Sequence, residues 1–184
     1  MLSLHLTWIR RLVVTFVLVV ALFCSTAPST AFAQDQEKPS LASDLAKQTL
    51  FDPTTYGPAL FTYTATMRDW NTSQPFFQHG YLEHNARFTL SGRPDDIAVG
   101  YNEGRHRILM DSLGVLQMSL VNNVTSRVFD RVLVEKYPEH RTLFRTLGWI
   151  ERIGFASYLS YRLSASHLRQ AQLNEQRMTQ LAVR

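Results

Sequence analysis

Apolar residues recur at three- and four-residue spacing through three long stretches of the chain, and this spacing predicts helices. The first stretch covers residues 55–73, and the second covers residues 105–135. The third begins near residue 139 and continues past residue 170. A shorter helix is expected at residues 40–51. The pattern therefore predicts an all-α fold, a small bundle of about three main helices.

The apolar stripes of these helices give the expected core. In the second helix the stripe runs from Leu109 to Val132 at helical spacing. Asn122 and Asn123 interrupt this helix, and we expect an interhelical hydrogen bond from them. We expect the three main helices to pack around six apolar residues: Trp70, Leu113, Leu116, Leu120, Ile150 and Tyr158.

Local signals place the ends of the first long helix. Thr55 is expected to cap it, Pro58 fits its first turn, and Pro75 is expected to end it. A long irregular segment, residues 76–104, separates it from the second helix and carries a turn signal at residues 92–96. Segments this long are usually functional or disordered, and the aromatic residues of this one favour packing onto the helices.

The first 33 residues form a leader. Arg10 and Arg11 precede an almost unbroken apolar run at residues 12–24, and Ala-Phe-Ala at residues 31–33 is a small-x-small cleavage site. These parts, in this order, are typical of a secretory signal peptide. We therefore expect an exported chain, cleaved near Ala33 and starting at Gln34.

Two other interpretations of the leader stay open. Cys24 could carry a lipid, although Phe23 stands where a lipoprotein has a small residue. The leader could also remain as an anchor, although its apolar run is short for a span of about 20 residues. Cys24 is the only cysteine, so a cleaved chain has no disulfide and no thiolate site. That composition fits a bacterial periplasm.

The sequence divides into four parts. We expect a signal peptide at residues 1–33, a linker and short helix at 34–54, a helical domain at 55–170, and a polar helical tail at 171–184. Cleavage leaves roughly 150 residues, the size of one domain. Such a chain can bury a core without disulfides or structural metal.

Charge indicates the class of partner. The net charge is +4, and loss of the two leader arginines leaves about +2. Arginine concentrates on the third helix and the tail, so the expected partner is a membrane surface or an envelope protein. A solvated helix face is the alternative. Nucleic acid is not an expected partner, and the oligomeric state is not indicated.

Charged residues such as Arg127 and Glu151 interrupt the helices, which disfavours bilayer spans.

Five polar residues near the end of the first long helix form the candidate site: Asp69, Thr72, His79, Glu83 and Asn85. Asp69 and Thr72 share one helix face close to the helix C-terminus, where a carboxylate opposes the helix dipole. We therefore expect a partner for Asp69, such as Arg87, Arg105 or a histidine.

Three interpretations of this cluster stay open. Its members could hydrogen-bond the backbone of the irregular segment and pin it to the helices, which is the favoured interpretation. Glu83 with His79 or His84 could carry acid–base catalysis. Asp69, His79 and Glu83 could bind a metal, but their spacing matches no specific motif, so neither metal nor cofactor is expected. The chain has no serine-nucleophile motif and no phosphate-binding loop.

A resemblance in one sequence pattern gives an expectation about the source of the chain and its location in the cell. The pattern D-x-x-[TS] followed by G-x-x-E-x-N is present as Asp69, Thr72, Gly80, Glu83 and Asn85. It resembles a helix-to-loop motif of uncharacterised exported and membrane-associated bacterial proteins, which usually carry proline where this chain has Ala86. The resemblance implies a bacterial source and an envelope location, and it implies no activity.

Together these patterns predict an exported protein of the bacterial envelope, non-enzymatic, with a structural or interaction role. Two alternatives are kept. One is a small enzyme or metal-binding protein with its site around Asp69, His79 and Glu83. The other is an integral membrane protein whose helices are interrupted by polar residues.

Overall fold

The fold is all-α, as the sequence predicts. The computed structural model describes residues 41–182, so the predicted leader and cleavage site lie outside the described residues. The described part has four α-helices and no β-strand: α2 (Leu41–Leu50), α3 (Pro53–Gln78), α4 (Tyr101–Lys136) and α5 (Arg141–Ala182). Short 3₁₀ turns, η1 (Ala86–Phe88) and η2 (Pro138–His140), precede α4 and α5 respectively. The bundle thus has one helix more than the three main helices expected.

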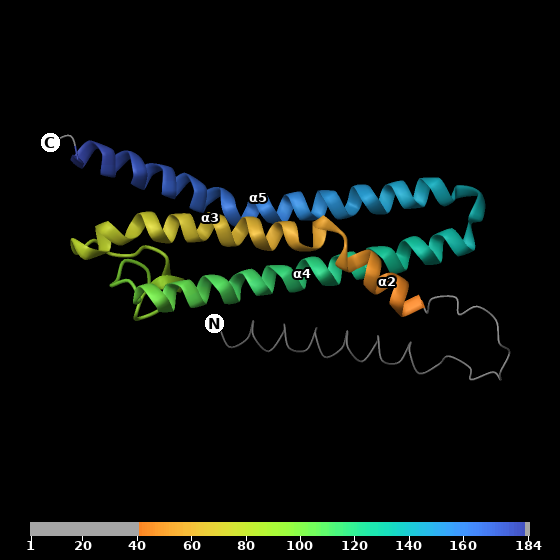
Figure 1. The fold of residues 1–184 in the computed structure, drawn as a ribbon, viewed down its shortest axis with the longest axis horizontal. Coiled ribbons are helices and arrows are strands. Elements are labelled where there is room, and N and C mark those ends of the chain that lie inside the picture. Colours follow the sequence, from red (N-terminus) through yellow and green to blue (C-terminus); the bar gives the residue numbers. More distant parts are fainter. Residues whose placement is uncertain (1–40, 183–184) are drawn as a thin grey trace. The chain divides into compact units, whose positions relative to one another are not determined.

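The three long helices lie alongside one another, and each contacts the other two (Figure 1). Helix α2 is the short helix expected before the bundle, and it packs mainly against α4. No helix in the described residues combines the length and the apolar content needed to cross a membrane.

The structure of α3 corrects three predictions about its ends. The helix begins at Pro53, so Pro58 lies inside it and not in its first turn. Asp52 is the N-cap and accepts a hydrogen bond from the Thr54 backbone N–H at 3.0 Å. Thr55 lies inside the helix instead and donates to the Thr49 carbonyl. The helix also continues through Pro75 to Gln78, because Phe77 beyond the proline packs against Trp70 with ring centroids 5.6 Å apart.

Many of the side chains in the interior of the bundle are small and polar. Threonine, serine and asparagine side chains are buried between the helices, and the amide of Asn123 donates to the hydroxyls of Thr54 and Thr55 at 2.9 and 2.7 Å. This confirms the expected interhelical hydrogen bond. The buried stripe of α4 consists of Gly104, Ile108, Ser112, Val115, Ser119 and Asn123.

The predicted core is mostly wrong. Trp70 is buried and Leu116 is partly buried. The other predicted core residues, Leu113, Leu120, Ile150 and Tyr158, are exposed. The buried apolar residues form two separate clusters: Trp70, Phe88, Val99 and Ile108 in one, and Ala59, Val115 and Leu159 in the other. The helices contact one another through the faces that carry small side chains. The leucine stripe of α4 is therefore left on the outside.

Trp70 shows how close this approach is. Its indole lies directly over Gly104 of α4, where a Cβ atom would overlap the ring, and its Nε1 donates to the Tyr101 carbonyl at 3.2 Å. A glycine is therefore required at position 104 for contact between α3 and α4.

The irregular segment between α3 and α4 is ordered against this tryptophan. Leu90 donates to Ile97 and Val99 donates to Phe88, which closes a turn at Gly92 that matches the predicted turn. Phe88 and Val99 are buried against Trp70. Within this segment, η1 is followed by an isolated bridge between Thr89 and Ala98.

The other end of the bundle is held by arginine and aspartate. Arg152 of α5 is buried, 2.9 Å from Asp130 of α4 and 3.5 Å from Asp52. Arg127 of α4 donates to the same Asp52 carboxylate at 2.5 Å. The Asp130 carboxylate lies against Gly148, where a Cβ atom would overlap it. We call these four charged residues the arginine–aspartate network.

We expect Gly104→Ala to lower the free energy of unfolding by about 1–3 kcal/mol, because the new methyl group must displace the Trp70 indole. Gly114→Ala in the same helix is the matched control, since a Cβ there has no neighbour within 4 Å. The control should raise stability by about 0.5–1 kcal/mol through helix propensity alone. Urea unfolding followed by circular dichroism measures both, and equal effects would contradict the close approach.

Candidate functional site

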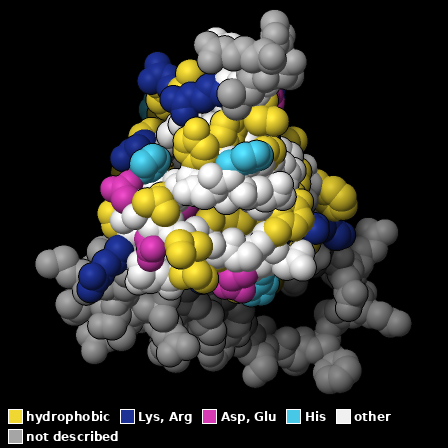
Figure 2. All heavy atoms as spheres, turned by 90° about the vertical axis from the view of Figure 1, so that its left-hand side faces the viewer, with side chains coloured by type: hydrophobic (Ala, Val, Ile, Leu, Met, Phe, Trp, Pro, Cys, Tyr) yellow, Lys and Arg dark blue, Asp and Glu magenta, His cyan; other side chains and the backbone are white. Residues whose placement is uncertain are grey.

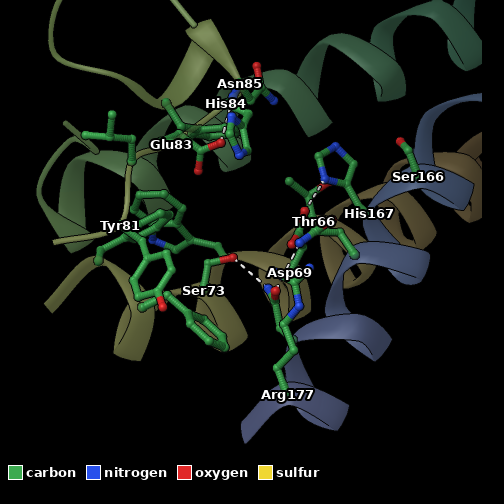
Figure 3. A pocket seen from close by; sticks show the side chains of 17 residues that line it. Thr66, Asp69, Ser73, Tyr81, Glu83, His84, Asn85, Ser166, His167 and Arg177 are labelled. Carbon is green, nitrogen blue, oxygen red and sulfur yellow. Dashed lines mark hydrogen bonds and ion pairs between the residues drawn. The ribbon is translucent and has the colours of Figure 1, made fainter. Parts of the chain in front are cut away.

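The predicted polar cluster borders a pocket of about 330 Å³. The pocket lies where α3 ends, between that helix, the irregular segment and the C-terminal half of α5. Asp69, Glu83 and Asn85 line it together with His84 (Figure 3). The surface at this end of the bundle mixes apolar side chains with both signs of charge (Figure 2).

Asp69 finds its partner on α5. Its Oδ2 lies 2.7 Å from Nδ1 of His167, and both side chains are largely buried. A histidine was among the expected partners, whereas Arg87 pairs with Asp111 instead. The second oxygen, Oδ1 of Asp69, is buried and has no hydrogen-bond partner among the described residues.

Glu83 faces the same pocket. Its Oε1 accepts a hydrogen bond from the Asn85 backbone N–H at 2.7 Å. Burial raises the pKa of Glu83 above the ordinary value for a glutamate, and the negative charge of Asp69 raises it further. The charge of Asp69 therefore disfavours the ionised form of Glu83 in this pocket.

The structure does not bring all five predicted residues into the pocket. Thr72 donates to the Asp69 backbone carbonyl at 3.0 Å and does not line the pocket. His79 is exposed outside it, with Nδ1 2.7 Å from the Pro75 carbonyl. Asn85 lines the pocket and caps η1 by accepting from the Arg87 N–H.

Three lining features were not part of the predicted site. His167 and Arg177 come from α5, and the aromatic residues Phe76 and Tyr81 form a wall with ring centroids 5.8 Å apart. His167 is separated from Asp69 by 98 positions along the chain. No local spacing in the sequence relates residues so far apart, and only the packing of α5 on α3 brings them together.

The tail of α5 contributes to this site. The helix continues without a break past the boundary predicted at residue 170, and Ala171 and Asn174 are buried. Asn174 donates to the Ser73 hydroxyl at 2.9 Å, and Arg68 of α3 pairs with Glu175 at 2.8 Å. These contacts hold the lining residues of α5 against α3.

A second cavity, of about 640 Å³, lies beside the arginine–aspartate network. Burial alone would raise the pKa of Asp52, but hydrogen bonds from Thr54 and the charge of Arg127 outweigh it and lower that pKa. Because these charges are already paired, this cavity is a weaker candidate. No cluster of three or more histidine, cysteine or acidic residues suited to a metal occurs within residues 41–182.

Comparison of the chain with known protein families, with curated proteins and with solved structures gives no match.

The raised pKa of Glu83 predicts a pH dependence of stability. A carboxyl group whose pKa is higher in the folded state stabilises the fold fully below its unfolded pKa of about 4.3 and loses that contribution as pH rises. Glu83→Gln keeps the Oε1 acceptor and removes the charge. We therefore expect its stability relative to wild type to increase between about pH 4 and pH 7. Urea midpoints across this range measure it, and a constant difference would contradict the assignment.

Proposed function

We propose that the chain is an exported, non-catalytic protein of the bacterial envelope that attaches to the anionic surface of a membrane. The proposal is carried by the outer face of α5. There, large apolar side chains are exposed beside arginines that have no ion-pair partner in the described part of the chain.

The apolar part of this face follows a helical repeat. Leu143, Leu147, Ile150, Tyr158 and Tyr161 recur at spacings typical of one helix side, and all are exposed. Tyr158 and Tyr161 are 61% and 74% exposed. Gly154, which lies between Ile150 and Tyr158, has nothing within 4 Å of a Cβ position. Exposed apolar surface of this kind marks an interaction site, and amphipathic tyrosine is suited to a membrane interface.

The charge of α5 favours anionic lipid as the occupant. Four exposed arginines of α5 outside the pocket of the candidate site make no ion pair with a described residue: Arg141, Arg145, Arg162 and Arg169. Glu151 is the only exposed acidic residue of the described α5 that likewise has no ion-pair partner, since Glu175 pairs with Arg68. Arg162 and Arg169 lie next to the exposed tyrosines in the helical repeat. Each basic residue near an anionic surface contributes about 1 kcal/mol to binding.

We expect Ile150→Asp to abolish cosedimentation of the purified chain with vesicles that contain phosphatidylglycerol. The paired change Arg162→Gln and Arg169→Gln should weaken that binding about thirtyfold and reduce its dependence on salt. Leu60→Asp, at an exposed position of α3, is the matched control and should bind as wild type does. Equal binding to neutral phosphatidylcholine vesicles, or capture of the chain by a protein partner alone, would refute attachment to anionic lipid.

Fractionation of the source cell tests export. We expect a chain that begins at Gln34, found with membranes and released by alkaline carbonate. Its mass decides between the alternatives. A wash-resistant chain that keeps the leader would be anchored by it. A wash-resistant chain without the leader would support the integral membrane alternative.

One observation favours the small-enzyme alternative. Asp69 holds Nδ1 of His167, and Glu83, whose pKa is raised, faces the same pocket. A carboxylate-oriented imidazole and a protonatable carboxyl group are the parts of an acid–base pair. Turnover of a substrate that is lost in Asp69→Asn, with stability unchanged, would establish this alternative.

A further inference from the structure

Three groups around the pocket of the candidate site have a hydrogen-bonding or charge capacity that no described residue satisfies. Asp69 pairs with His167 through Oδ2 only. Oδ1 of Asp69 is buried and accepts no hydrogen bond from a described residue. Glu83 makes no ion pair within the described region, and neither does Arg177. The arginine–aspartate network at the other end of the bundle differs, because its carboxylates and guanidinium groups contact each other.

These groups enter the pocket from different sides. In Figure 3, Glu83 and His84 lie at one end, and Arg177 reaches up from α5 at the opposite end. Asp69 lies between them, with His167 at its side. The ring of His84 pairs with Asp95, and its charge lowers the pKa of Glu83 less than burial raises it. The pocket thus offers an acidic end and a basic end.

We propose that this pocket binds a small zwitterion, with its ammonium group at Asp69 and Glu83 and its anionic group at Arg177. A carboxylate accepts charge-assisted hydrogen bonds from an ammonium, and a guanidinium donates two parallel ones to a carboxylate or phosphate. The rings of Phe76 and Tyr81 supply an apolar wall. A volume of about 330 Å³ is within the range of small-molecule sites.

This site goes beyond membrane attachment and is independent of it. The same chemistry occurs in two sources, a free amino acid and the phosphoethanolamine headgroup of a lipid. Both carry an ammonium and an anionic group separated by a few bonds. A soluble form of each can be tested on the same protein without vesicles.

Titration calorimetry of the purified chain with L-phenylalanine and with glycerophosphoethanolamine is the direct test. Binding of either supports the proposal, and the tighter one identifies the source. Phenethylamine and 3-phenylpropionate, each with one charged end of phenylalanine, should bind about tenfold more weakly than phenylalanine if the free amino acid is the ligand. The proposal is overturned if neither zwitterion binds, or if the singly charged analogues bind as tightly as the zwitterion.

Substitutions in the pocket test which residues bind the ammonium group and which bind the anionic group of the ligand. We expect Asp69→Asn and Glu83→Gln to weaken zwitterion binding about tenfold each, and Arg177→Gln to do the same. Arg177→Gln should also remove the preference for phenylalanine over phenethylamine, which a general loss of structure would not do. Glu151→Gln and Arg162→Gln, two exposed positions of α5 outside the pocket, are the matched controls. A loss in the controls equal to that in the pocket variants would refute the site.

Discussion

The close approach of α3, α4 and α5 along small and polar side chains is the constraint on which the rest of the structure depends. Gly104 lies under the Trp70 indole, and Gly148 lies against the Asp130 carboxylate. Between these two points, the buried amide of Asn123 on α4 donates to Thr54 and Thr55 on α3. Small side chains permit backbones to approach, and each buried polar group needs a partner there. The larger apolar side chains are consequently left on the outside.

This arrangement explains which parts of the fold the sequence could predict. Helix positions follow from apolar spacing, and the all-α class is confirmed. The orientation of each helix is not given by spacing, because α4 has a leucine stripe and a serine-glycine stripe at the same period. The apolar stripe predicts that Leu113 and Leu120 lie in the core, but both are exposed. Pro75 failed as a stop signal because Phe77 packs on Trp70.

The candidate site also contains residues that the sequence predicted and residues that it did not. Asp69, Glu83 and Asn85 were identified from their residue types, and the structure places them around one pocket. His167 and Arg177 could not be found in this way, because α5 reaches α3 only through the packing of the whole bundle. The same helix carries the lining residues on one side and the exposed apolar repeat on the other. The proposed membrane attachment and the proposed ligand binding therefore use opposite faces of α5.

The central claim is that lipid covers the outer face of α5, and fluorescence quenching tests it most directly. Tyr158→Trp combined with Trp149→Phe places an indole on that face, while the buried Trp70 serves as the internal reference. With anionic vesicles made from brominated lipid, we predict a blue shift and strong quenching of the new tryptophan. A matched Leu60→Trp chain, also with Trp149→Phe, should remain unquenched. Emission at position 158 that does not change with brominated anionic vesicles would contradict the account.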